Sequence, residues 1–132
     1  MKMKTTITPQ QALKQITSGH LCQLKGLDVQ DFTYIFNDAK EVILLTYYLN
    51  DQATIATAIE ENESEIRKCA VNATGVMLQL ICGKSHNLLI EDMLVINMVN
   101  DLFPKNTALS LDVQHSESTD FKLRIDLYIV NK

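Results

Sequence analysis

Glycine is scarce in this sequence: the 132 residues contain four, Gly19, Gly26, Gly75 and Gly83. A loop that wraps a phosphate group needs several glycines close together, so that backbone amides can approach the oxygens, and its usual form ends in a Lys-Ser or Lys-Thr pair. Four glycines this far apart cannot form a Gly-rich loop with such a pair behind it. We therefore expect no cofactor site of this kind, and no enzyme that depends on one.

Cysteine is also sparse, and its odd count argues against a disulfide framework. Cys22, Cys69 and Cys82 lie in or beside apolar segments, where reduced thiols act as small hydrophobic groups. A structural zinc site needs ligands at closer spacing, and His86 is the nearest histidine to Cys82. We predict no metal site, and we expect Cys82 to be a buried, unreactive thiol at the end of a strand.

Clusters of positive charge and long hydrophobic runs are missing as well. The formal net charge is -4, and the basic residues are scattered along the chain. A surface that follows nucleic-acid phosphates needs a basic patch, and a helix that spans a bilayer needs about 20 apolar residues. No apolar signal-peptide core follows the first lysines. We expect a cytoplasmic protein that binds neither nucleic acid nor a membrane.

The hydrophobic share of 46% is sufficient for one core in a chain of this length. We divide the chain into an N-terminal segment, residues 1–25, and a folded part, residues 26–132. In the segment, Thr8 precedes Pro9, and proline suits the first turn of a helix while threonine can cap it. A short helix that continues to about Ser18 is expected there.

The folded part alternates between strand and helix periodicity. Its strongest pattern is Gly75–Gly83, an apolar run with glycine at both ends, which is typical of a buried central strand. We predict an α+β fold in which helices pack on a four-stranded mixed sheet. The predicted strands are Glu41–Leu49, Gly75–Cys82, Thr107–Val113 and Phe121–Val130, and the predicted helices are Asp28–Ala39, Asp51–Asn72 and Leu88–Phe103.

The last two predicted strands are expected to pair as an antiparallel hairpin. The register that pairs their apolar side chains on one side places Asp112 opposite Lys122 on the other side. The final strand alternates apolar residues with polar ones such as Arg124 and Asp126, as a strand with one buried face does. These polar side chains are therefore predicted to point outward.

Several short motifs, taken in order, resemble the C-terminal domain of the tubulin-like division protein FtsZ. They are Ala73–Met77 at the turn into the central strand, Gly83 at its end, Glu91–Met93 opening the long helix, and Thr107–Leu109 with Leu123–Leu127 in the last two strands. The resemblance runs from Gly26 to the end of the chain and implies a stand-alone domain without the GTPase half. Because the phosphate loop is also absent, it implies that this chain alone does not bind GTP.

The resemblance also singles out Asp28 and Asp31. In the family, an Asn and two acids at this spacing reach into the nucleotide site of the neighbouring subunit and orient the water that attacks the γ-phosphate, and here Gly26 replaces the Asn. These two aspartates are thus the candidates for a catalytic role in trans. The simpler interpretation is that both complement the free amides of a first helical turn, and we favour it.

The functional hypothesis is a non-enzymatic interaction module that binds itself or a tubulin-like division or filament protein. In the family one sheet face packs on the GTPase domain, so here self-association or Met1–Leu24 would have to cover it. One alternative is a small-molecule binder or enzyme of the chorismate-mutase or YjgF-like trimer type, but Arg67 and Arg124 are the only arginines available to clamp a carboxylate. Another is an excised domain of a longer GTPase.

Overall fold

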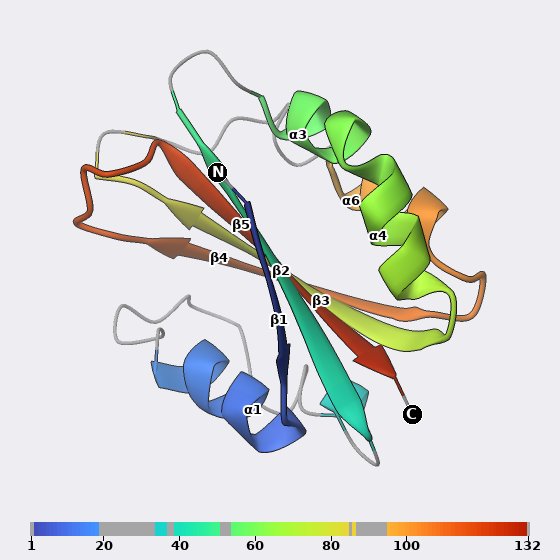
Figure 1. The fold of residues 1–132 in the computed structure, drawn as a ribbon. Helices are drawn as coiled ribbons and strands as arrows, with labels where there is room; N and C mark the ends of the chain where they lie inside the picture. Colours follow the sequence, from blue (N-terminus) through green and yellow to red (C-terminus); the bar gives the residue numbers. More distant parts are fainter. Residues whose placement is uncertain are drawn as a thin grey trace.

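The computed structural model describes residues 2–18, 34–36, 39–50, 54–84, 86 and 95–131. Within them, five strands form one mixed sheet in the order β1-β2-β5-β3-β4, which confirms the predicted α+β class (Figure 1). The strands are β1 Lys2–Ile7, β2 Glu41–Leu49, β3 Ala73–Cys82, β4 Ala108–His115 and β5 Leu123–Asn131. The helical elements are α1 Pro9–Ser18, the 3-10 turn η2 Tyr34–Phe36, α3 Ile55–Glu61, α4 Glu63–Ala70 and α6 Val95–Leu102.

Helices α3, α4 and α6 cover one face of the sheet and form the larger core with it. Because side chains alternate along a strand, every second residue of β2, β3 and β5 points into this core. Leu45, Leu78 and Leu127 are fully buried there, against Ile66 of α4 and Val99 of α6 among others. Burial of aliphatic side chains, at roughly 1.5–3 kcal/mol each, is the main stabilising contribution on this face.

Strand β5 lies inside the sheet, and the predicted hairpin of the last two strands is wrong. β5 is antiparallel to both β2 and β3, so that Leu127 lies opposite Leu45 on one side and Leu78 on the other. β4 instead pairs in parallel with β3, where Leu111 lies opposite Leu78. The reason is burial: seven of the nine residues of β5 are buried and the other two are half-buried, whereas β4 is mostly half-buried and suits an edge.

The N-terminal segment contributes both a strand and a helix. β1 was not predicted, and it adds a fifth strand by pairing antiparallel with β2, with Thr5 opposite Leu44. The predicted helix is confirmed: the Thr8 amide donates to Gln11 Oε1 at 2.9 Å, and the Gln11 amide donates to Thr8 Oγ1 at 3.1 Å. This reciprocal pair is a capping box, which fixes the start of α1.

The other predicted helices are shorter or divided in the described residues. The range Asp51–Asn72 holds two helices, and the side chain that caps the first belongs to Thr54, which accepts from the Thr57 amide at 3.1 Å. Asn62 separates the two helices, and its side chain donates back to the Ala58 carbonyl at 2.7 Å and does not cap α4. Much of Asp28–Ala39 and the first half of Leu88–Phe103 lie outside the described residues.

Of the two glycines in the described residues, Gly83 tolerates an added side chain less. Its amide donates to the Lys122 carbonyl at 2.8 Å, and an added Cβ would collide with the Phe121 carbonyl oxygen. We expect Gly83→Ala to lower the free energy of unfolding by about 1–3 kcal/mol, measured by urea denaturation, because a backbone must move. Gly75→Ala should cost less, since the colliding atom is a methyl group of Ile35.

The exposed residue Glu60 supplies the control for this comparison. Glu60→Ala should change the free energy of unfolding by no more than about 0.5 kcal/mol. A Gly83→Ala protein as stable as this control would contradict the close approach of β3 to the chain before β5.

Candidate binding site

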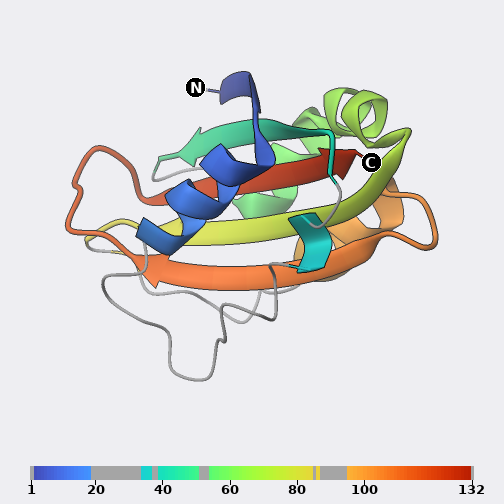
Figure 2. The same ribbon diagram turned by 90° about the horizontal axis from the view of Figure 1, so that it is seen from below.

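The second face of the sheet is covered at one end by α1 and η2. Figure 2 shows α1 lying across the strands on this side, with the other helices behind the sheet. Ala12 and Ile16 of α1 are fully buried and form a smaller apolar cluster with Val42, Met77 and Val130 of the sheet. The N-terminal segment therefore supplies part of the cover that this face needs.

Beyond this cluster, the second face carries a row of polar side chains. Thr46 of β2 lies opposite Asp126 of β5, Asp126 lies opposite Gln79 of β3, and Gln79 lies opposite Asp112 of β4. All four are buried: Thr46 is 7% exposed, and Asp112 and Asp126 are only 1% and 2% exposed. Buried carboxylates need hydrogen-bond partners, so this row is held by specific contacts.

Asp126 is the centre of one group of contacts. The Thr46 hydroxyl donates to its Oδ1 at 2.9 Å, and Arg124 Nη2 donates to its Oδ2 at 2.9 Å. The Arg124 side chain is 31% exposed, so this ion pair has one buried and one partly solvated partner. Two residues apart on β5, both side chains point to the same face of the sheet.

Asp112 is the centre of the second group. The side-chain amides of Gln79 and Gln114 each donate to its Oδ2 at 3.0 Å. Both amide nitrogens thus point at Asp112, and the side-chain carbonyl oxygen of Gln79 can accept a hydrogen bond.

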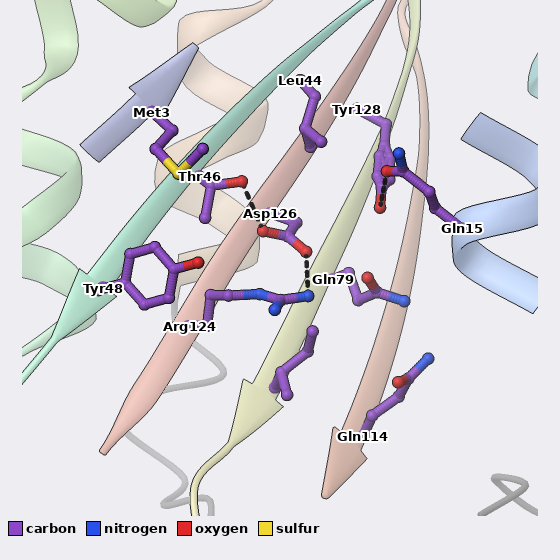
Figure 3. Close-up of a pocket in the computed structure, with 11 residues that line it drawn as sticks. Met3, Gln15, Leu44, Thr46, Tyr48, Gln79, Gln114, Arg124, Asp126 and Tyr128 are labelled. Atoms are coloured by element: carbon purple, nitrogen blue, oxygen red, sulfur yellow. Dashed lines mark hydrogen bonds and ion pairs between the residues drawn. The ribbon is translucent and has the colours of Figure 1, made fainter. Parts of the chain in front are cut away.

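A pocket of about 380 Å³ lies over the first group of contacts (Figure 3). Its floor includes Thr46, Gln79, Arg124 and Asp126, and α1 adds Gln15 at one side. Gln114 and the apolar and aromatic side chains of Met3, Leu44, Tyr48, Ile81 and Tyr128 complete the lining. The pocket thus combines one cation, one anion and neutral polar groups with an apolar wall.

Burial raises the pKa of two of these groups. It raises the pKa of Asp126, and the opposing effects of Arg124 and Thr46 do not cancel this. Burial, together with the nearby Asp126 charge, also raises the pKa of Tyr128, so its phenol remains protonated and donates to Gln15 Oε1 at 3.5 Å.

The site residues predicted from the sequence have different outcomes. Asp28 and Asp31, the candidates for a role in trans, lie outside the described residues, as does Gly26. Cys82 is fully buried at the end of β3, as expected, and Cys69 is also buried. Within the described ranges, no three His, Cys, Asp or Glu side chains are placed to hold a metal ion.

The described part of the chain contains no helix with the length and apolar character that crossing a membrane requires.

Arg124, Asp126 and Asp112 were not predicted as site residues, because the hairpin register made them outward-facing polar groups. The placement of Asp112 opposite Lys122 is wrong, since Gln79 takes that position. One sequence signal points to the true arrangement: Gln79 interrupts an apolar strand that is buried on both faces. A glutamine in such a strand needs polar partners on the neighbouring strands.

Comparisons with known proteins place the fold. No family model matches the sequence, and no curated protein matches it. Among solved structures, CetZ from Methanosaeta thermophila strain DSM 6194 superposes with a TM-score of 0.59 at 14% identity, over 90% of this chain and 34% of that chain. The class defined by the fold is therefore distantly tubulin-like, and this chain spans about a third of CetZ.

Two further solved structures match more loosely. E. coli HypE, a hydrogenase maturation protein, gives a TM-score of 0.43 at 12% identity, over 92% of this chain and 42% of that one. Thiamine monophosphate kinase from Aquifex aeolicus gives 0.41 at 14% identity, over 82% and 43%.

The raised pKa of Asp126 predicts a pH dependence of stability. Because the folded protein holds this proton more tightly than the unfolded chain, stability is lost as the pH rises from the unfolded to the folded pKa. Asp126→Asn has no charge to bury, so its free energy of unfolding should fall less with rising pH. Urea denaturation from about pH 4 to pH 7 measures the two slopes.

The quantity to compare is the slope of the unfolding free energy against pH. The absolute stability also changes, because the substitution removes the ion pair with Arg124. Asp120→Asn is the matched control, because Asp120 is exposed. If both Asp126→Asn and Asp120→Asn give the same slope of unfolding free energy against pH as the unaltered protein, the raised pKa of Asp126 in the folded protein is refuted.

Proposed function

We propose that this chain is a non-enzymatic interaction module, which binds a second copy of itself or a tubulin-like filament protein. The observation that best supports this is the outer strand β1. Its residues 3–6 are exposed, and Met3, at 51%, is one of two exposed large hydrophobic residues in the described part of the chain. A strand of this kind presents backbone N–H and C=O groups to which a partner strand can add.

The distant tubulin-like fold supports the same proposal. The chain matches about a third of CetZ, and its sequence lacks a Gly-rich phosphate loop. A domain of this shape without its own nucleotide site would act through binding. Lys4 limits how freely β1 pairs, because a charged side chain on an edge strand discourages open-ended sheet growth. A closed two-fold pair of β1 strands fits these features better than a long polymer does.

The small-molecule alternative gains one specific observation, the presence of Arg124 in the pocket. One chain forms this pocket by itself, which supports a ligand site within the module.

Sedimentation velocity tests the association, with the protein alone and with a purified tubulin-like GTPase. We expect either a dimer or co-sedimentation, and Met3→Asp should weaken it about tenfold or more, because a carboxylate would be buried at the joined edges. Val71→Asp is the matched control: Val71 is the other exposed large hydrophobic residue, at 68%, and lies after α4.

A protein that stays monomeric at every concentration and does not sediment with the GTPase would contradict the proposal. Equal loss of association in the Met3 and Val71 variants would place the contact away from β1.

A further inference from the structure

The pocket on the second sheet face has a charge pattern that restricts what can bind in it. Arg124 and Asp126 are both in its lining, and they neutralise each other across 2.9 Å. A ligand with one net charge would engage one partner and leave the other without its counter-charge in a poorly solvated place. A ligand that carries both charges can satisfy both partners at once.

The hydrogen bonds of Arg124 are incomplete in the described structure. A guanidinium has five N–H donors, and here one bond, to Asp126, is formed. Its Nε–H is buried and has no acceptor among the described residues. A carboxylate is the acceptor that matches a guanidinium best, because two parallel hydrogen bonds can form.

Acceptors for a ligand cation lie beside this donor. Each oxygen of Asp126 accepts one hydrogen bond in the structure, from Thr46 or from Arg124, and a carboxylate oxygen can accept another. Gln79 donates its amide N–H to Asp112, which leaves its carbonyl oxygen as an acceptor at the pocket floor. An ammonium group, with three N–H donors, fits this set.

Apart from the amides of Gln15 and Gln114, the rest of the lining is mainly apolar or aromatic and selects the remainder of the ligand. Leu44 and Ile81 lie on either side of the polar floor residues, on β2 and β3. Tyr48 adds an aromatic wall, and its ring is held edge-on to Phe121 with centroids 5.7 Å apart. Figure 3 shows the side chains of Tyr48, Arg124 and Asp126 facing a common space. The volume of about 380 Å³ lies in the range of small-ligand sites.

We propose that this pocket binds an α-amino acid with an apolar side chain. The ligand carboxylate pairs with Arg124, its ammonium group pairs with Asp126, and its side chain packs against Leu44, Tyr48 and Ile81. Binding replaces the internal ion pair by two ion pairs with the ligand, and no bond is made or broken. Met3 of β1 also lines this pocket, but the ligand tests below leave β1 unchanged, so their failure can be told apart from a failure of the association proposed above.

Isothermal titration of the full chain tests the proposal with three matched ligands: leucine, 3-methylbutylamine, which lacks the carboxylate, and 4-methylpentanoate, which lacks the amine. We expect leucine to bind about tenfold or more tightly than either analogue, since each analogue loses one ion pair. Phenylalanine and methionine extend the series to other apolar side chains. Analogues that bind as well as leucine, or no binding of any amino acid at millimolar concentration, would overturn the proposal.

Two variants then assign the charges. Asp126→Asn should reverse the preference so that 4-methylpentanoate binds better than leucine, and Arg124→Gln should reverse it in favour of 3-methylbutylamine. Arg67→Gln is the control, because Arg67 is the only other arginine and forms an exposed pair with Glu63 on α4. Unchanged ligand preference in both pocket variants would refute the assignment, and if a variant does not fold, the three-ligand series on the unaltered protein decides.

Discussion

Burial of strand β5 between β2 and β3 is the constraint on which the rest of the structure depends. Its residues Ile125, Leu127 and Ile129 are fully buried toward the helices, while Tyr128 and Val130 are buried on the opposite face. Such a strand exposes unpaired backbone and apolar surface unless it has neighbours on both edges and cover on both faces. β4 is thereby displaced to the edge, and the N-terminal segment is recruited to the second face.

The same constraint brings charge into the interior. With β5 in the middle, its polar positions Arg124 and Asp126 lie over the centre of the sheet and not at its rim. Burying an ion pair rarely adds stability, because the cost of removing two charges from water offsets their attraction. Because Asp126 is buried and Arg124 only partly exposed beside a pocket, we propose that this pair serves recognition more than stability.

The tubulin-like likeness and the interior pocket concern different surfaces. The fold is shared with CetZ over most of this chain, and α1 packs on the sheet face opposite α3, α4 and α6. The cover by α1 is partial, and the polar pocket lies beside it. The β1 edge and the pocket beside α1 are thus the two surfaces for which we propose a protein partner and a small ligand.

Much of the fold was predictable from local sequence. The bounds of β2, the start of α1 at Thr8-Pro9, and the buried strand ending at Gly83 follow from periodicity, capping residues and glycine placement, which act over a few residues. β1 was missed because a short edge strand of lysines and threonines has no buried face to mark it.

The sequence by itself therefore determined most of the strands and helices, β1 excepted, and that the fold belongs to the α+β class. Only the tertiary structure decided that β5 pairs with β3 and not with β4, and with that choice it placed Asp112, Arg124 and Asp126. The physical reason is that Leu111 finds an equally apolar partner in either register. The local sequence pattern cannot distinguish the two pairings. The requirement that every buried strand has neighbours on both edges and cover on both faces does distinguish them.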